Sequence, residues 1–287
     1  MAPRVASYMS TEVIIVRPWE NLAHVRRLML RHNVGRIIVA DEDDKPVGII
    51  TLTDIVNAIL NKYPTRPINT LSASDVMSRD VKTITPRKSI KHAAQIMTKY
   101  KIGGLPVVNE DGTIRGIITR TDITRAFADH YKGEYTVSDL AREAYAVANP
   151  YHAIFHVARL ASLDPAGKVV VVDDDGKPIG IITRRDLAFT NISYEVRMTR
   201  GKDRFRKIKS RDYMGRDKIV ALREYFVPLA KDIMSEDVIT ISGDEDAAEA
   251  ARIMVTNDIG ALPVVDDEGR LTALLTKHEI VKVVASR

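Results

Sequence analysis

The sequence predicts an α/β protein made of four tandem β-α-β-β-α repeats that pair into two modules. One phrase, consisting of an apolar strand, an acidic turn, a second apolar strand and Thr-x-x-acid, occurs four times in the 287 residues. Apolar residues at helical spacing precede the phrase. One such unit is too small to cover both faces of its own sheet. Pairing two units buries these faces, which accounts for an even number of copies.

The four copies share one register. They occupy residues 36–54, 104–122, 168–186 and 261–279, and read RIIVADEDDKPVGIITLTD, GLPVVNEDGTIRGIITRTD, KVVVVDDDGKPIGIITRRD and ALPVVDDEGRLTALLTKHE. Met9, Met77 and Met234 each precede the Thr of their own phrase by 42 residues. Ala141 has the same place in the third copy. This constant spacing indicates an internal repeat.

Each copy predicts the same order of elements, which the second copy illustrates. A short extended segment, VKTITP, comes first at residues 81–86. Residues 90–97 predict a helix because their apolar side chains recur at helical spacing. The strand PVV, a turn rich in Asp, Asn and Gly, and the strand GIIT follow. A closing helix ends the unit, as in DIVNAIL at residues 54–60 of the first copy.

The repeats divide the chain into two predicted domains. The boundaries are 1–134, with motifs at about 7–62 and 75–130, and 135–287, with motifs at about 138–190 and 232–285 and a basic insert at 191–231. Each module leaves apolar helix faces that need covering. We therefore expect the two modules to associate face to face into a flat disc, within one chain or through a homodimer.

Composition narrows the classes of function. The chain has no cysteine, which excludes disulfides, thiolate catalysis and cysteine-based metal sites. It contains no apolar run of about 18 residues, so no membrane span is predicted. Its first residues show no hydrophobic segment typical of a secretory signal, and we expect a cytoplasmic protein. Gln95 is the only glutamine and 28% of the residues are charged, a composition that leans towards thermophiles.

The G-I-I-T-x-x-D phrase after a P-V-V-D strand resembles the CBS domain, named after cystathionine β-synthase. The resemblance covers roughly residues 7–285 apart from the insert. Four copies in two CBS-pair (Bateman) modules are similar to the gamma subunit of AMP-activated protein kinase and its archaeal relatives. The resemblance implies a non-catalytic regulatory protein that binds AMP, ADP or ATP as a regulatory ligand. It would report energy or stress to a protein partner, which the sequence does not name.

The Thr-x-x-Asp end of the phrase has a structural and a functional interpretation. A strand ends and a helix begins at Thr51, so Thr51 and Asp54 form a variant of the helix capping box. Capping alone does not explain why Asp, rather than Glu, recurs. A helix N-terminus also offers free N–H groups and a positive dipole end to an anion. A Thr hydroxyl beside it can donate to a phosphate, and a short carboxylate can accept both hydroxyls of a ribose.

The resemblance implies that these positions hold the ribose and phosphate of adenine nucleotides. The implied contacts are Thr51 with Asp54, Thr119 with Asp122, and Thr183 with Asp186. The fourth copy departs from the pattern, since Glu279 replaces Asp and Ala273 replaces Gly. The site of Thr276 and Glu279 is therefore expected to be the weakest of the four.

A basic residue stands just before the first apolar strand of two phrases. Arg36 and Lys168 have this place in the first and third copies, whereas Gly104 and Ala261 have it in the others. The resemblance implies that these bases reach the phosphates; the alternative is an exposed surface base. Further bases within the phrases are Arg120, Arg184 and Arg185. The adenine, by resemblance, would lie against first-strand residues whose alternative role is the core, namely Ile14, Ile15, Thr83 and Ile84.

Neither a metal site nor a catalytic site is predicted. His152 and His156 are four residues apart on a predicted helix, but no third ligand accompanies them in the sequence. The acidic turns lack the spacing of a calcium loop. Neither a phosphate-binding glycine loop nor a paired nucleophile and base occurs.

The insert carries the basic charge of the chain. Residues 197–218 hold ten bases and three acids, a net charge of +7, while the whole chain has +5. Such a block with interleaved aromatic residues favours RNA, and the alternative function is an RNA- or ribosome-associated factor in translation regulation or hibernation. The implied RNA-binding residues are Arg197, Arg200, Lys202, Arg204, Phe205, Arg206, Lys207, Lys209, Arg211, Tyr213, Arg216 and Lys218. A solvated linker, a segment folded against acidic turns, and a dock for an acidic protein are the other interpretations.

Overall fold

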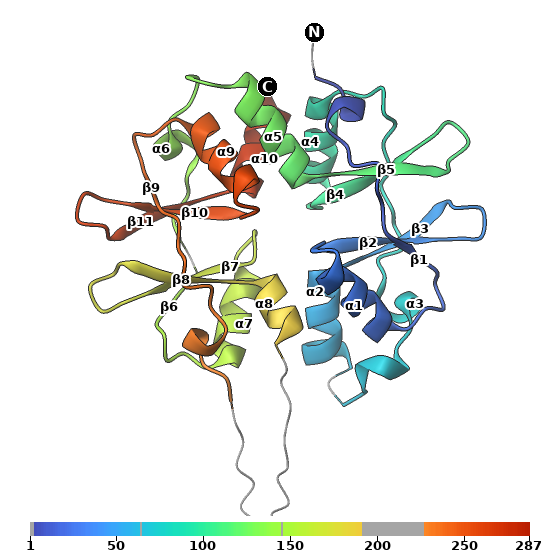
Figure 1. The fold of residues 1–287 in the computed structure, drawn as a ribbon, viewed down its shortest axis with the longest axis horizontal. Helices are drawn as coiled ribbons and strands as arrows, with labels where there is room; N and C mark the ends of the chain where they lie inside the picture. Colours follow the sequence, from blue (N-terminus) through green and yellow to red (C-terminus); the bar gives the residue numbers. More distant parts are fainter. Residues whose placement is uncertain (1–2, 64, 145, 191–226) are drawn as a thin grey trace, which may run out of the picture.

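The computed structural model describes residues 3–63, 65–144, 146–190 and 227–287. Four repeats of similar build follow one another (Figure 1). In the first two repeats the elements are η1 (Val5–Ser7), β1 (Ile15–Val16), α1 (Leu22–Arg31), β2 (Arg36–Ala40), β3 (Pro46–Thr51), α2 (Leu52–Asn57), η2 (Ala58–Lys62), η3 (Ile68–Thr70), α3 (Ala73–Val76), α4 (Ile90–Lys99), β4 (Gly104–Val108), β5 (Ile114–Thr119) and α5 (Arg120–His130). In the last two they are α6 (Val137–Leu140), β6 (Val147–Ala148), α7 (Ile154–Leu163), β7 (Lys168–Val172), β8 (Pro178–Thr183), α8 (Arg184–Phe189), η4 (Ala230–Asp232), β9 (Ile241–Ser242), α9 (Ala247–Thr256), β10 (Ala261–Val265), β11 (Leu271–Thr276) and α10 (Lys277–Ser286).

Each repeat contributes one small sheet. Three of the sheets have the strand orders β1-β2-β3, β6-β7-β8 and β11-β10-β9, and the fourth is the hairpin β4-β5. The short first strand is parallel to its neighbour, as where β1 meets β2, and the hairpin that follows is antiparallel. The hairpin register is the same in all four repeats, with cross-strand partners Arg36 and Thr51, Gly104 and Thr119, Lys168 and Thr183, and Ala261 and Thr276. The residue before each apolar strand therefore lies directly opposite the Thr of its phrase.

The helices confirm the predicted spacing of apolar residues. Helix α4 buries Ile90, Ala93, Ala94 and Met97 on one face, and Ser89 caps its first turn by accepting from the backbone N–H of His92. The helix ends at Lys99, where Lys101 adopts a positive φ of 54° and turns the chain towards β4. The β-α-β-β-α order of the repeat thus follows from its sequence.

Within a module, the segment that leads into one repeat pairs with the hairpin of the other. In the first module Ser10 bridges to Ile117 and Ser78 bridges to Ile49. In the second module the equivalent bridges join Arg142 to Leu274 and Ser235 to Ile181. This reciprocal exchange links the repeats in the pairs predicted from the sequence.

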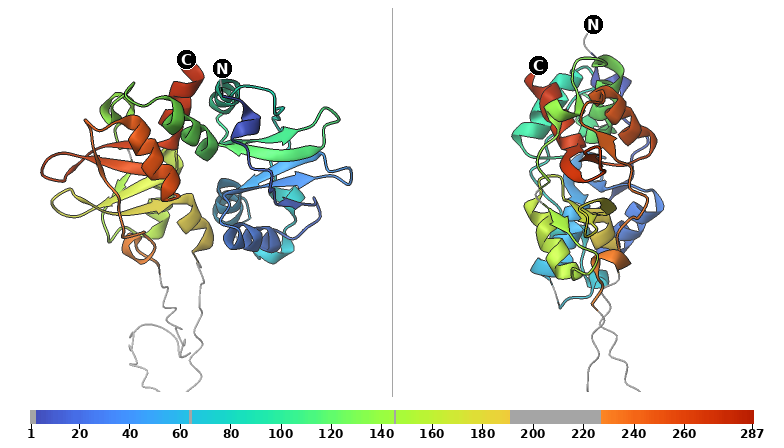
Figure 2. Two further views of the ribbon diagram at one scale, coloured as in Figure 1. Left: turned by 45° about the horizontal axis from the view of Figure 1, so that its top comes forward. Right: turned by 90° about the vertical axis from the view of Figure 1, so that its left-hand side faces the viewer.

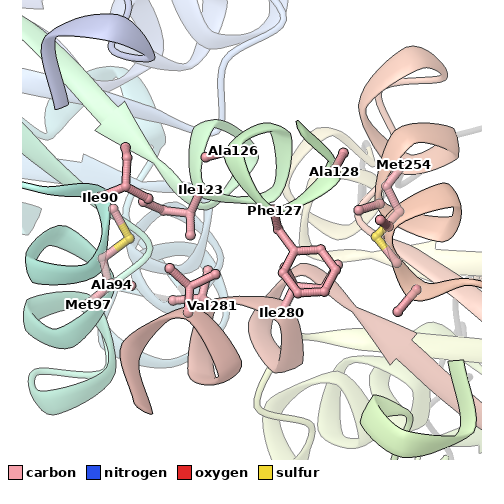
Figure 3. Packing of buried hydrophobic residues seen from close by; sticks show 14 of the residues in the cluster. Ile90, Ala94, Met97, Ile123, Ala126, Phe127, Ala128, Met254, Ile280 and Val281 are labelled. Atoms are coloured by element: carbon pink, nitrogen blue, oxygen red, sulfur yellow. The ribbon is translucent and has the colours of Figure 1, made fainter. Parts of the chain in front are cut away.

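The two modules pack through their helices into a disc. Helix α10 contacts α4 and α5, α5 contacts α9, and α2 contacts α8. The second and fourth repeats share one core, in which Phe127 is fully buried and Ile280 and Met254 come from the other module (Figure 3). The first and third repeats meet where Arg26 donates to the carbonyl groups of Ala188 and Phe189. Figure 2 shows the disc from two further sides. The expected face-to-face association occurs within one chain.

The basic segment at 197–218, with every residue assigned above to RNA binding, lies outside the described residues. The described part of the second module ends at Thr190, just after α8, and resumes at Val227. The domain boundary at 134/135 stays a prediction.

Candidate functional site

A cavity of about 730 Å³ lies where the four repeats meet. Residues 51–54 at the start of α2 and residues 183–186 at the start of α8 line it. Other segments of the four repeats add to the wall with residues 78, 80–82, 101–104, 165–168, 235, 237–239 and 258–261. Since α2 and α8 are in contact, two helix N-termini open into one space.

The Thr-x-x-Asp phrase forms a capping box, as predicted. In the first repeat Oδ2 of Asp54 accepts hydrogen bonds from the backbone N of Thr51 at 2.7 Å and from its Oγ1 at 2.6 Å. Oδ2 of Asp186 accepts the same two bonds from Thr183, at 2.7 and 2.8 Å. Within the described part of the chain, Oδ1 of Asp54 and Oδ1 of Asp186 accept no hydrogen bond. One carboxylate oxygen therefore holds the cap and the other is available to a ligand.

Basic side chains outnumber acidic ones around the cavity. Eight Lys and Arg residues and five Asp residues line it. Five of the eight bases are Arg36, Arg120, Lys168, Arg184 and Lys277. Across the ranges that the structure describes, none of these five forms an ion pair with a carboxylate. The Nε of Arg120 is buried without a hydrogen-bond partner, which is costly for a charged donor and favours an incoming acceptor.

Burial lowers the pKa values of these bases because a charged group loses its hydration there. It lowers the pKa of Arg36 to about 10. It lowers the pKa of Lys168 to about 8, where Asp186 opposes the shift while Lys277 and Arg184 add to it. Burial and the neighbouring Arg184 also lower the pKa of Arg120. A cluster of like charges that lower one another's pKa attracts anions.

Arg36 and Lys168 cross from their own repeat to its partner. The guanidinium group of Arg36 donates to the carbonyl of Gly103 in the second repeat. A Cβ at Gly104 would collide with this guanidinium group, which explains why the second phrase has glycine where the first has arginine. In the second module, a Cβ at Gly260 would lie 3.1 Å from Nζ of Lys168. Both bases line the cavity, as the phosphate-binding prediction requires.

In the second and fourth repeats the Thr and the acid of the phrase do not line this cavity, although Arg120 and Lys277 between them do. Asp122 is buried, which raises its pKa although Thr119 donates two hydrogen bonds to it. Its Oδ1 accepts from Arg125 at 3.3 Å. Thr276 and Glu279 are buried as well. The four predicted sites thus divide into two that open on the cavity and two that are closed.

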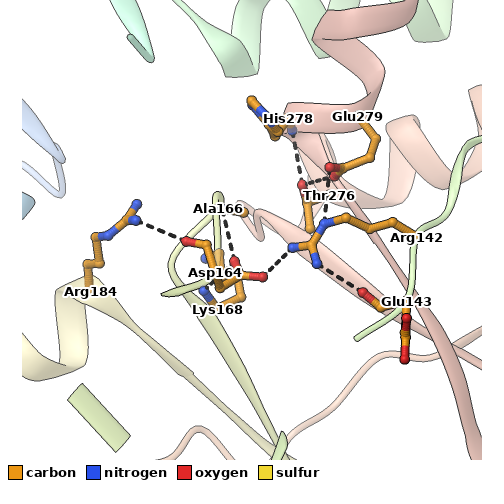
Figure 4. Close-up of polar contacts among 9 residues, drawn as sticks. All are labelled: Arg142, Glu143, Asp164, Ala166, Lys168, Arg184, Thr276, His278 and Glu279. Carbon is orange, nitrogen blue, oxygen red and sulfur yellow. Dashed lines mark hydrogen bonds and ion pairs between the residues drawn. The ribbon is translucent and has the colours of Figure 1, made fainter. Parts of the chain in front are cut away.

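An ion-pair cluster fills the cleft of the fourth repeat (Figure 4). The Nε of Arg142 donates to Oε1 of Glu279 at 3.1 Å. Its Nη2 pairs with Asp164, and its Nη1 donates to the carbonyl of Glu143 at 3.0 Å. The hydroxyl of Thr276 donates to the second carboxylate oxygen of Glu279.

Comparison with known proteins decides the family. The CBS domain model matches residues 5–61, 73–129, 137–190 and 230–286. The chain belongs to the CBS domain family. The CBS protein MJ1225 of Methanocaldococcus jannaschii is 27% identical to it over 287 residues, covering 96% of each chain. The crystal structure of MJ1225, described as a proposed archaeal homologue of g-AMPK, matches with a TM-score of 0.79 and 26% identity over 98% of this chain and 99% of that one.

Two further proteins are similar to this chain in fold or in part of the sequence. A conserved protein of Pyrococcus horikoshii has the same fold, with a TM-score of 0.62, 21% identity and coverage of 98% of this chain and 99% of that one. A 17.7 kDa protein of Acidianus ambivalens is 33% identical over 129 residues, covering 45% of this chain and 76% of its own. None of the helices that the structure describes is long and apolar enough to cross a membrane.

Sequence reasoning missed several residues of this CBS site. Lys277 lines the cavity. The other phrases have Leu or Arg at this position, so the repeat pattern did not single out the lysine. The adenine candidate Ile84 is a core residue, while the cavity wall comes from the residues just before it, such as Val81. Arg142 and Asp164 were not singled out. The signal was present, because Arg142 stands where the other leading segments have serine.

The paired histidines of the third CBS repeat lie close together. The ring centroids of His152 and His156 are 4.6 Å apart, and Nδ1 of His152 accepts from the backbone N of Asn149. In the described ranges no group of three or more His, Cys, Asp or Glu side chains is placed to hold a metal ion.

Proposed function

We propose that this CBS protein is a non-catalytic regulator that binds adenine nucleotides in the two clefts opening on the central cavity. AMP, ADP or ATP is the proposed ligand. Occupancy of the clefts would report energy or stress to a partner protein. One observation carries the proposal: two helix N-termini open into a single cavity with an excess of basic side chains, and each has an Asp with one oxygen that accepts no hydrogen bond from the described residues.

Each part of a nucleotide has a matching group in the cavity. The two hydroxyls of a ribose can donate to Asp54 or Asp186, whose Oδ1 atoms face no other donor within the described residues. The phosphate fits the five cations, because charge-assisted hydrogen bonds to arginine are among the strongest in proteins. The volume lies within the range of about 300–1,000 Å³ of small-molecule sites.

Thr119 and Asp122 stay a predicted third site. A ligand there would have to replace the contact between Asp122 and Arg125. We therefore expect the clefts of Asp54 and Asp186 to fill at lower nucleotide concentration. The predicted site of Thr276 and Glu279 is considered in the next subsection.

Calorimetric titration with AMP, ADP and ATP tests the proposal. Asp54→Ala and Asp186→Ala should each weaken binding at their own cleft about tenfold to a hundredfold, because a hydrogen bond to a charged group contributes about 1.5–3 kcal/mol. Asp139→Ala is the matched control. Asp139 forms the same capping box with Thr136 but does not line the cavity, so its loss should leave binding unchanged.

Thermal unfolding gives a second readout. A ligand at 100 times its dissociation constant adds about 2.7 kcal/mol to the unfolding free energy. All three nucleotides should raise the melting temperature of the wild type. Absence of both heat and thermal shift with every nucleotide would end the proposal.

A second function rests on the charge of the insert alone. We propose that residues 197–218 bind RNA or ribosomal subunits, because this segment concentrates a net charge of +7. The slope of log affinity against log salt is about −0.7 per phosphate contact for single strands. Neutralising Arg204, Arg206, Lys207 and Lys209 together should flatten that slope. If the protein does not sediment with any RNA from native extract at low salt, this function is excluded.

A further inference from the structure

In each repeat, the extended segment before the first strand contributes one residue that bridges to the hairpin of the partner repeat. This residue occupies the same position in all four repeats. Ser10, Ser78 and Ser235 hold this position against Ile117, Ile49 and Ile181. Arg142 holds it against Leu274 in the fourth repeat. Ser78 and Ser235 line the cavity beside the open clefts. By this equivalence, the side chain of Arg142 stands where the two open clefts have Ser78 and Ser235.

We propose that the chain's own Arg142 is the occupant of the fourth cleft and excludes nucleotide from it. The inference rests on the proposed function, since it concerns which of the four clefts accept a nucleotide. It assigns Arg142 as the residue that limits the number of nucleotides bound by one chain.

Both carboxylate oxygens of Glu279 already accept a hydrogen bond from within the chain. One of its oxygens accepts from Nε of Arg142 at 3.1 Å, and the other accepts from the hydroxyl of Thr276. In the open clefts one oxygen of Asp54 and one of Asp186 stay unused within the described residues. The methylene group that Glu has beyond Asp lengthens the side chain towards Arg142.

Charge also disfavours a nucleotide in the fourth cleft. The cluster joins one guanidinium group to two carboxylates, those of Glu279 and Asp164. The side chain of Asp164 is 0% exposed and those of Glu279 and Arg142 are 7% and 14% exposed. The charge of Arg142 is already matched by these two carboxylates, so the cluster adds no uncompensated positive charge for a phosphate.

Three departures from the repeat pattern meet in this cluster. Arg142 replaces serine, and Glu279 replaces aspartate. Asp164 comes just before Pro165, and Pro165 stands at the position where the other repeats have a residue of positive φ, namely Asn33, Lys101 and Asp258. The three positions are far apart in sequence, yet their side chains pair with one another (Figure 4). Independent drift at three positions would not yield complementary charges at one point.

Arg142 also acts on the neighbouring open cleft through Asp164. The Oδ1 of Asp164 accepts from the backbone N of Ala166 at 2.9 Å and of Lys168 at 3.0 Å. The loop held in this way carries Lys168 to the wall of the central cavity. Variants designed to open the fourth cleft should therefore retain Asp164.

Equilibrium dialysis with labelled AMP at saturation tests the proposal by counting bound nucleotides. The double variant R142S/E279D restores the serine and aspartate of the open clefts and should bind one more AMP per chain than the wild type. R142K is the matched control, because a lysine still fills the cleft with positive charge, and its count should equal that of the wild type. A folded double variant with the wild-type count overturns the proposal. If the wild type itself binds no AMP, the proposed function fails instead.

A measurement on the wild type decides the matter even where a variant does not fold. Photolabelling with 8-azido-AMP, followed by peptide mapping, should mark segments around the central cavity. It should leave residues 137–148 and 271–276 unlabelled, whereas Lys277 belongs to the wall of the central cavity. Label in either of these two segments would mean that the fourth cleft accepts nucleotide in the presence of Arg142 and would overturn the proposal.

Discussion

The clefts of the third and fourth repeats have the same backbone design and opposite electrostatics. In both, a Thr caps a helix and an acidic side chain three residues later accepts its hydroxyl. Asp186 then faces a cavity rich in bases, whereas Glu279 is held by a buried arginine. The difference comes from the residue that the partner repeat contributes, Ser235 in one cleft and Arg142 in the other. Between the third and fourth repeats, the residue contributed by the partner repeat is what differs at this point, whereas the closed second repeat has Ser10 there.

The largest expected effect concerns the stability of the closed cleft. Arg142→Ala leaves the carboxylates of Asp164 and Glu279 buried without their cation. Breaking a buried ion pair from one side costs about 3–5 kcal/mol. Arg125→Ala removes the half-exposed partner of Asp122 and should cost less than about 1 kcal/mol. Urea unfolding of both variants checks this contrast, which would be contradicted by equal losses.

The sequence predicted the backbone features that the two clefts share but not which of the clefts is open. The repeat register, the helix faces and the capping boxes followed from spacing and residue type. The open and closed clefts depend on long side chains that cross between repeats, such as Arg36 to Gly103. Spacing along one repeat contains no information about which partner a long side chain reaches. The sequence also did not predict which helices of the two modules are in contact, because any apolar helix face could pack against any other.

A smaller effect is expected where Arg36 crosses between repeats. Gly103 and Gly35 occupy equivalent places in the second and first repeats. A Cβ at Gly103 would lie 2.7 Å from a guanidinium nitrogen of Arg36, whereas one at Gly35 would lie 3.6 Å from Leu52. Gly103→Ala should displace Arg36 and cost about 1 kcal/mol, the low end for overpacking, because the end of a long side chain can move.

Gly35→Ala is the control for this prediction, since its Cβ makes an ordinary contact. Chemical denaturation and AMP titration should show losses for Gly103→Ala and smaller ones for Gly35→Ala. Matching values for the two variants would mean that the position of Arg36 matters neither for packing nor for the ligand.

The smallest expected effect is a pH dependence at the open cleft of the third repeat. Burial lowers the pKa of Lys168 from its usual 10.5 to about 8. Lys168 is charged below pH 8 and loses its proton above it, so AMP affinity should fall by a few-fold between about pH 7 and 9. A bound phosphate favours the charged form, so binding above pH 8 should take up protons. Titration in buffers of different ionisation enthalpy measures this uptake, and Lys168→Arg should abolish it.

The lowered pKa of Lys168 also affects the stability of the free protein. Its contribution to the unfolding free energy increases with pH, whereas its contribution to AMP affinity decreases. The unfolded chain holds the Lys168 proton up to about pH 10.5 and the folded chain releases it near pH 8. The unfolded state therefore binds more protons in this window, and the contribution of Lys168 to the unfolding free energy rises with pH there. Comparing wild type and Lys168→Met across this window isolates that contribution, and parallel curves would contradict the lowered pKa.

A crystal structure with AMP at saturating concentration tests the central claim most directly. The account predicts AMP in the clefts of the first and third repeats, with ribose hydroxyls on Asp54 and Asp186 and phosphates among the bases of the central cavity. Arg142 should keep its contacts with Glu279 and Asp164. Empty clefts at Asp54 and Asp186, or AMP on Glu279 with Arg142 displaced, would contradict it.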